Sequence, residues 1–247
     1  MPLIEIKGLT KVYGGLTAVD GLDLTIGAGE IFGFLGPNGA GKTTTLKMMA
    51  GLIRPTSGSV SLDGHDVATE PLAAKAILGF VPDRPFVYEK LTATEFMAFI
   101  GGLYSMDPAV TAPRSVELLS LFGLASWSGE LVEGFSHGMR QRLVMAAALL
   151  HRPKILVVDE PMVGLDPKGV RLLREVFLGL KAEGSAVFMS THSLDLAEKI
   201  ADRVGIINRG RLIALGSVDE MRRMADMPGS ALDEVFLKLT EERAEVS

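Results

Sequence analysis

A glycine-rich segment places the strongest single constraint on what this chain can fold into. Residues 36–43 read Gly-Pro-Asn-Gly-Ala-Gly-Lys-Thr and fit the pattern G-x-x-x-x-G-K-[ST]. The apolar run of residues 31–35 precedes this segment, and residues 42–50 follow with the pattern of a helix. Glycines let successive backbone N–H groups converge on phosphate oxygens, and the positive end of the helix points at the same anion. The spacing therefore predicts a strand–loop–helix unit that binds nucleotide phosphates.

The residue types in this loop suggest individual contacts. The Lys42 ammonium group is expected to reach the β- and γ-phosphates, and the Thr43 hydroxyl to ligate Mg²⁺. An ordinary glycine turn between a strand and a helix is the alternative, and the buried strand and the helix on either side favour nucleotide binding. The expected phosphate cradle consists of Gly36, Pro37, Asn38, Gly39, Ala40, Gly41, Lys42, Thr43 and Thr44.

A second buried strand ends in two acidic residues. Residues 155–158 are apolar, and Asp159 and Glu160 follow them. A buried strand delivers its last residues to the carboxyl edge of an open α/β sheet, where ligands bind. We expect Asp159 to hold Mg²⁺ through its water shell and Glu160, on the opposite side, to polarise a water in line with the γ-phosphate. A strand that simply ends in solvated acids is the alternative.

A second candidate anion site lies far along the chain. Phe135-Ser136-His137-Gly138-Met139 precedes a helix predicted over residues 139–150. The Ser136 hydroxyl, the Gly138 backbone and the helix N-terminus together suit an anion. Because the phosphate loop already encloses the γ-phosphate of its own nucleotide, this second site fits the nucleotide of another subunit. A capped helix start is the alternative.

The remaining pattern predicts an α/β fold with a mainly parallel sheet core, an antiparallel β subdomain and an inserted helical subdomain. A helix capped by Asp166 and opened by Pro167 is expected to end near residue 183. We expect one domain over residues 1–247, with the core in 1–83 and 135–247 and the helical subdomain in 84–134, its helices broken at Pro108 and Pro113. The other expected strands cover residues 3–9, 17–26, 59–63, 186–190, 204–208 and 212–215, and a last helix covers 231–243.

The composition excludes several classes of protein. The chain has no cysteine, which rules out a disulfide scaffold, a thiolate metal site and cysteine catalysis. The chain has 25 Lys and Arg against 30 Asp and Glu, and its cations are scattered and form no basic stripe. We therefore expect no nucleic-acid partner. The longest uninterrupted apolar run, residues 143–150, is far too short for a membrane span, and residues 1–10 have no signal-peptide core. A cytoplasmic location is therefore expected.

Taken together, these motifs resemble the ATP-binding subunit of an ABC transporter over nearly the whole chain. Residues 36–44 correspond to its Walker A loop, 80–83 to the Q-loop, 135–139 to the signature motif, 155–160 to Walker B, 164–167 to the D-loop and 190–192 to the switch. The resemblance implies that Tyr13 stacks on adenine and that His192 donates a hydrogen bond to the γ-phosphate and holds the attacking water. It also implies that Asp166 couples to the opposite site, in addition to capping its helix.

Three positions depart from the common family pattern. His137 stands where glycine is usual in the signature, and Met139 where glutamine is usual; both are tolerable if Ser136 and Gly138 make the contacts. Asp83 replaces the usual Q-loop glutamine, and its shorter side chain could still meet Mg²⁺ through a water. Tyr13 has an alternative interpretation as an exposed ring that follows a strand.

The resemblance implies ATP and Mg²⁺ as cofactors and ATP hydrolysis that powers transport through a separate integral membrane permease subunit. Two copies would sandwich two ATP molecules, and the permease would dock on the helical subdomain near Phe86 and Tyr88, at the inner face of the cell membrane. The signature and the C-terminal sequence of residues 233–239 are similar to exporters of the ABC-2 class. A soluble ABC-type ATPase of an assembly system, such as iron–sulfur cluster assembly, is the alternative.

Overall fold

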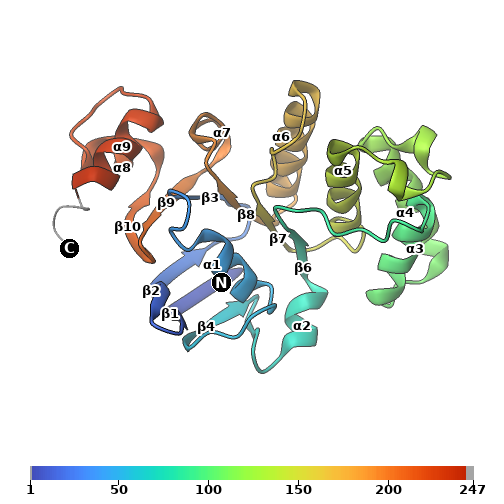
Figure 1. Cartoon of the computed structure of the whole chain (residues 1–247), viewed down its shortest axis with the longest axis horizontal. Coiled ribbons are helices and arrows are strands. Elements are labelled where there is room, and N and C mark those ends of the chain that lie inside the picture. Colours follow the sequence, from blue (N-terminus) through green and yellow to red (C-terminus); the bar gives the residue numbers. More distant parts are fainter. Residues whose placement is uncertain (1, 243–247) are drawn as a thin grey trace.

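The computed structural model describes residues 2–242 and contains two sheets, with most of the helices along one side of the larger sheet (Figure 1). The larger sheet has the strand order β10-β9-β3-β8-β7-β6. Only β10 runs antiparallel to its neighbour in this sheet, so the predicted, mainly parallel core is confirmed. Its strands are β3 (Ile31–Leu35), β6 (Leu78–Val81), β7 (Ile155–Asp159), β8 (Ala186–Thr191), β9 (Arg203–Asn208) and β10 (Arg211–Gly216).

The smaller sheet is antiparallel and has the order β2-β1-β4-β5. Ile4 of β1 pairs with Ile26 on one side and with Leu62 on the other. The sheet confirms the predicted antiparallel subdomain, although β1 continues past its predicted end to Tyr13. Its strands are β1 (Ile4–Tyr13), β2 (Leu16–Ile26), β4 (Ser57–Leu62) and the short β5 (His65–Asp66).

Strand β7 is buried on both faces of the large sheet. Ile155 and Val157 pack with α1 (Lys42–Met49) and the antiparallel sheet. Leu156 and Val158 pack on the opposite face with α5 (His137–Ala148) and α6 (Pro167–Ala182). Successive side chains of a strand point to opposite faces, so an unbroken apolar run is needed to bury both. This packing fixes the strand ends from which the phosphate loop and the acidic pair project.

Residues 84–134 form the helical part of the fold, and all of them are described. They form α3 (Ala93–Leu103), α4 (Pro108–Leu121) and the short 3₁₀ turns η1 (Ala125–Trp127) and η2 (Val132–Gly134), without a strand. These helices gather beside α5 at one end of the molecule, in the green part of Figure 1. The subdomain boundaries at residues 83/84 and 134/135 stay a prediction.

The predicted helix break at Pro113 is wrong. Helix α4 begins at Pro108, as expected for proline in a first turn, but then continues through Pro113 to Leu121. The Asp107 side chain caps the helix, and Leu118 and Leu119 are buried in the core. This capping and packing outweigh the cost of a helix-interior proline, about 3 kcal/mol.

Several short elements of the fold were not predicted from the sequence. These are α2 (Pro71–Ala76), β5, β6 and α7 (Leu194–Ile200). Helix α7 packs with α8 (Val218–Met224) and α9 (Leu232–Glu242) against β9 and β10 in a third apolar cluster. The predicted last residue of α9, residue 243, lies outside the described residues. Over residues 2–242, no helix has the length and apolar character needed to cross a membrane.

Candidate nucleotide site

The phosphate loop links the carboxyl end of β3 to the first residue of α1, as the spacing predicts. Gly41 occupies the N-cap position of α1 with φ of 110°, a region that favours glycine. A Cβ atom there would also lie only 2.4 Å from the Ala18 carbonyl oxygen, so no other residue fits. No side chain caps α1. The N-terminus of the helix is therefore open to an anion.

The Lys42 ammonium group lies inside the loop. Its Nζ donates to the Gly36 carbonyl at 2.6 Å and to the Pro37 carbonyl at 3.2 Å, and the residue is buried. Burial lowers the pKa of Lys42, while the charges of Glu160 and Asp159 act in the opposite direction. The cation thus stands between two carbonyl oxygens and the two acidic residues.

The two acidic residues at the end of β7 have different surroundings. Asp159 is buried and accepts a hydrogen bond from the Ser190 hydroxyl on β8. Glu160 has φ of 49°, which is uncommon for a residue with a side chain, and its N–H donates to the Ser190 carbonyl at 3.0 Å. This turn directs the Glu160 side chain toward His192, while Asp159 stays at the edge of the sheet beside Ser190. The two carboxylates therefore have different hydrogen-bond partners.

Glu160 and His192 are in direct contact. His192 Nδ1 lies 2.7 Å from Glu160 Oε2, and the His192 backbone N–H donates to the same oxygen at 3.3 Å. Since a carboxylate only accepts hydrogen bonds, Nδ1 carries the proton in this contact. The Glu160 side chain is only 18% exposed, whereas that of His192 is 67% exposed. The imidazole is therefore held at one nitrogen and free to meet a ligand with the other.

One cavity of about 440 Å³ brings most of the predicted nucleotide site together. Next to it, a second cavity of about 320 Å³ is lined by Gly36, Pro37, Asn38 and His192. Among the predicted residues, the first cavity is lined by Tyr13, Asn38, Gly39, Ala40, Gly41, Lys42, Thr43, Thr44, Asp83, Asp159 and Glu160.

Tyr13 and Asp83 lie at the margins of the larger cavity. Tyr13 is 47% exposed, and Lys11 Nζ lies 5.0 Å from the centroid of its ring. Asp83 is exposed and its Oδ1 accepts from the Arg84 N–H at 2.9 Å. Asp83 also lines an adjoining groove of about 770 Å³. It thus connects the nucleotide cavity with the helical part of the fold.

Ser136, His137 and Gly138 line neither of these two cavities. Ser136 is the N-cap of α5, and its Oγ accepts from the Met139 N–H at 3.3 Å. A Cβ atom on Gly138 would lie 2.9 Å from the Gly164 carbonyl oxygen, so this segment packs against the loop before α6. In that loop Asp166 caps α6 by accepting from the Gly169 N–H at 2.8 Å. The two segments form one exposed surface, separate from the cavities that hold the other predicted residues.

The oxygen donors suit a magnesium ion that arrives with its nucleotide. Thr43 and Asp159 supply a hydroxyl and a carboxylate at one cavity, and Mg²⁺ takes its remaining ligands from phosphates and water. Within residues 2–242 no cluster of three or more His, Cys, Asp or Glu could hold a metal by itself.

Sequence reasoning missed two residues beside these cavities. The Ser190 hydroxyl donates a hydrogen bond to Asp159. Its position at the end of a predicted buried strand was the one feature of the sequence that could have indicated this contact. Phe236 of α9 lines the smaller cavity together with His192. It was predicted only as part of the last helix, and no local pattern connects it with the phosphate loop.

Comparison with known proteins gives matches over most of the chain. Residues 19–163 match the family model described as "ABC transporter". The chain is similar to the daunorubicin/doxorubicin resistance ATP-binding protein DrrA of Streptomyces peucetius, with 41% identity over 89% of this chain and 66% of the relative. It is also similar to the linearmycin resistance ATP-binding protein LnrL of Bacillus subtilis, with 36% identity over 89% of this chain and 70% of the relative. The chain spans about two thirds of the length of these relatives.

Solved structures show the same fold. One, described as the ATP binding subunit of an ABC transporter, superposes with a TM-score of 0.92 at 33% identity, over 96% of this chain and 99% of that chain. Another is a dimeric post-hydrolysis state of the ATP-binding cassette MJ0796 bound to ADP and Pi. It has a TM-score of 0.78 at 26% identity, over 87% of this chain and 98% of that chain.

Proposed function

This chain belongs to the ABC transporter family as an ATP-hydrolysing subunit, and we propose that it powers export through a separate membrane subunit. The direction of transport is inferred from relatives whose names concern drug resistance. The observation that carries the proposal is the single cavity shared by Lys42, Asp159 and Glu160. These relatives favour the transporter over the alternative of a soluble assembly ATPase.

In the proposed site the phosphate loop binds ATP before chemistry begins. The open N-terminus of α1 and the loop N–H groups receive the phosphates, and the Lys42 ammonium group exchanges its carbonyl partners for β- and γ-phosphate oxygens. The Tyr13 ring at the mouth of the cavity stacks on adenine. The Thr43 hydroxyl would ligate Mg²⁺ directly, Asp159 would hold it through its water shell and Asp83 would contribute through a water; the ion would neutralise charge that develops on the phosphates.

Hydrolysis then depends on the contact between Glu160 and His192. A water attacks the γ-phosphorus, its proton passes to the Glu160 carboxylate, and ADP leaves as the bond to the bridging oxygen breaks. His192 keeps its Nδ1–H on Glu160, so donation from Nε2 to the γ-phosphate uses the imidazolium form, in which both ring nitrogens carry a proton. The positive φ of Glu160 supports this role, because strained backbone is concentrated where geometry serves function.

A second copy of the chain completes the site. Ser136 and His137 are exposed, Gly138 is half-buried, and all three lie outside both cavities, so they do not face the phosphate loop of their own chain. We infer that they close over the γ-phosphate bound by the other copy, with Asp166 at the contact. Dimer closure would then depend on nucleotide contacts that exist only in the closed state.

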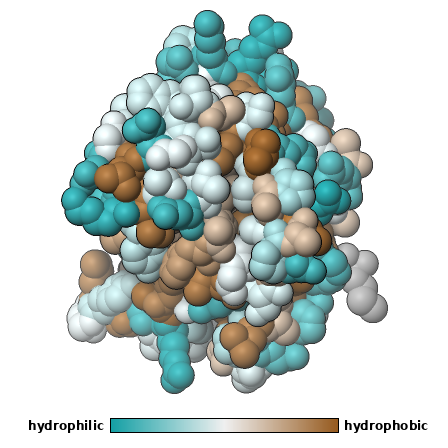
Figure 2. Space-filling model, turned by 90° about the vertical axis from the view of Figure 1, so that its right-hand side faces the viewer, coloured by the Kyte–Doolittle hydropathy of each residue, from teal (hydrophilic) through white to brown (hydrophobic). Residues whose placement is uncertain are grey.

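The adjoining groove provides the proposed docking site for the permease. It is lined by Asp83 and by apolar side chains from the helical part, and Phe86 at its edge is 85% exposed. Tyr88, 58% exposed, stacks edge-on against Phe99 nearby. Figure 2, which looks onto the helical end of the molecule, shows apolar surface gathered in a hollow there. Docking here would place the subunit at the inner face of the membrane.

The direct test measures phosphate release by the purified chain with Mg-ATP and with ATP plus a chelator. Turnover that requires Mg²⁺ and disappears in Lys42→Ala supports the site. Unchanged turnover in that variant would remove the phosphate loop from the reaction and contradict the proposal.

A further inference from the structure

Two C-terminal helices pack directly behind the segment that carries His192. Helix α7 begins at Leu194, immediately after Ser193, and its Ala197 is buried in the same cluster as Met221 of α8 and Leu232 of α9. The Ser193 N–H donates to the Thr191 hydroxyl at 2.9 Å, which ties the start of α7 to the end of β8. The position of α7 therefore sets the position of His192.

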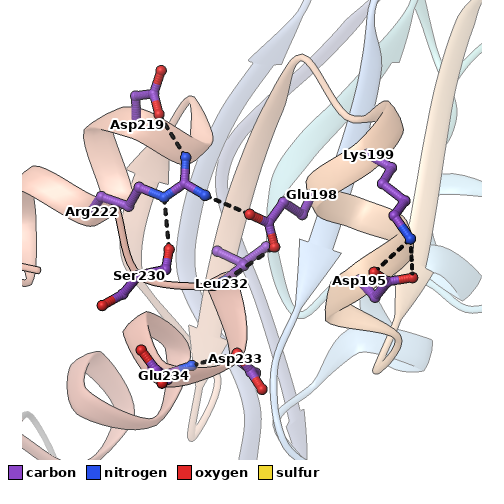
Figure 3. Close-up of polar contacts among 9 residues, drawn as sticks. All are labelled: Asp195, Glu198, Lys199, Asp219, Arg222, Ser230, Leu232, Asp233 and Glu234. Carbon is purple, nitrogen blue, oxygen red and sulfur yellow. Dashed lines mark hydrogen bonds and ion pairs between the residues drawn. The ribbon is translucent and has the colours of Figure 1, made fainter. Parts of the chain in front are cut away.

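A single arginine joins α8, the following loop and α7 (Figure 3). Arg222 donates through Nε to the Ser230 carbonyl at 2.8 Å and through Nη1 to Asp219 at 2.8 Å. Its third nitrogen, Nη2, donates to Glu198 Oε1 on α7 at 2.5 Å. The planar guanidinium group thus links α8, the loop that follows it and α7. A lysine ammonium group lacks this planar arrangement of donors and cannot make the same three contacts.

Both carboxylate oxygens of Glu198 accept hydrogen bonds from the C-terminal part of the chain. Oε1 accepts from Arg222, and Oε2 accepts from the backbone N–H of Leu232 at the start of α9, at 3.2 Å. The side chain of Glu198 is 28% exposed and that of Arg222 is 22% exposed, so water competes only weakly for the hydrogen bonds between them. Glu198 is therefore the attachment point of both α8 and α9 on α7.

Helix α9 also reaches the nucleotide side of His192. Phe236 of α9 lines the cavity of about 320 Å³ with Pro37, Asn38, Thr191 and His192. Helix α9 is thus in position to limit how far the switch segment can move. By contrast, Lys199 on α7 pairs only with Asp195 of the same helix among the contacts in Figure 3, and both side chains are exposed.

We propose that Glu198 and Arg222 are positioning residues that fix α7 against the C-terminal helices and thereby hold the His192 imidazole against Glu160. The inference rests on the proposed role of His192 in ATP hydrolysis. Glutamine at position 198 retains one acceptor but faces two donors, Arg222 and the Leu232 N–H, so one contact is lost. The α7 helix then gains freedom, and His192 leaves its hydrogen bond for part of the time.

The test combines kinetics with nuclear magnetic resonance of the full chain. Glu198→Gln and, as a second variant, Arg222→Lys are expected to lower kcat about tenfold, with KM for ATP and the nucleotide Kd unchanged. The imidazole signals of His192, one of 4 histidines in the chain, should shift or broaden, while those of the other three stay in place. Lys199→Gln, which breaks an ion pair within α7, is the matched control and should change neither readout.

The two readouts separate this proposal from the proposed function. Wild-type His192 signals in folded Glu198→Gln or Arg222→Lys would overturn the positioning role, whatever happens to kcat. Equal changes in Lys199→Gln would also overturn it, because any disturbance of α7 would then suffice. A His192→Ala variant with wild-type turnover would instead contradict the hydrolytic role of His192, while the resonance measurement would still decide whether Glu198 positions the ring.

Discussion

Glu160→Gln removes the proposed base with little change in shape. Both donors of His192, the ring Nδ1–H and the backbone N–H, reach the same oxygen of Glu160, at 2.7 and 3.3 Å. A glutamine with its amide oxygen at that position keeps both hydrogen bonds. The variant therefore leaves the contact between residues 160 and 192 intact while the side chain can no longer accept a proton from water.

The size of the effect follows from the chemistry that is removed. Loss of a general base lowers a rate by about 10²–10⁴-fold, which corresponds to about 3–5 kcal/mol of activation free energy. Phosphate release should fall by that factor, with nucleotide Kd unchanged because Lys42 and the phosphate loop are untouched. Gel filtration with ATP should show a dimer, since bound nucleotide is no longer consumed.

The matched control is Glu175→Gln. Glu175 lies on the exposed face of α6, where it accepts from Arg171 Nε at 3.2 Å, so the same chemical change occurs far from the cavity. Wild-type turnover is expected in this control. Hydrolysis by Glu160→Gln at the wild-type rate would refute the assignment of the base, and loss of ATP binding would show that the residue serves nucleotide affinity instead.

Three further predictions concern binding and stability. Lys42→Ala should abolish ATP binding, measured by fluorescent nucleotide titration, because the phosphates lose their buried cation; retained micromolar affinity with normal turnover would count against the phosphate loop. Tyr13→Ala should weaken ATP binding about five- to tenfold through loss of ring stacking, while Tyr13→Phe keeps it; equal affinities would make Tyr13 a surface ring. Burial lowers the pKa of His151 to about 4 from 6.5, so the folded state binds fewer protons than the unfolded state in this window and stability should fall as the pH drops from 6.5 to 4. Denaturant unfolding of His151→Gln should show a weaker loss, by up to about 3 kcal/mol. The same pH profile as the wild type would contradict the neutral, half-buried ring.

The sequence was most informative where local pattern and function coincide. The buried strand, the glycine loop and helix α1 follow one another within a short stretch, so spacing alone predicted them. Asp166 and Pro167 likewise marked the start of α6. These features depend on neighbouring residues, and the tertiary structure only had to place them at one sheet edge.

Features that depend on distant residues could not be predicted in this way. Pro113 stays helical because α4 buries Leu118 and Leu119, and that packing is not visible in the local sequence. Ser190 meets Asp159 across two strands that are 31 positions apart in the chain. Phe236 approaches the phosphate loop from the last helix. Each contact required the fold before it could be recognised.

The central claim is that Ser136 acts on the nucleotide of another copy. Ser136→Arg should leave ATP binding by the monomer intact, because the side chain lines neither phosphate cavity, but should block dimerisation and turnover. Mixing this variant with Lys42→Ala measures the claim most directly. In a mixed dimer one composite site has an intact Lys42 and an intact Ser136 from the partner, so two inactive parents should regain partial phosphate release. Inactivity at every mixing ratio, with mixed dimers confirmed, or loss of ATP binding by the isolated Ser136→Arg monomer, would contradict the account.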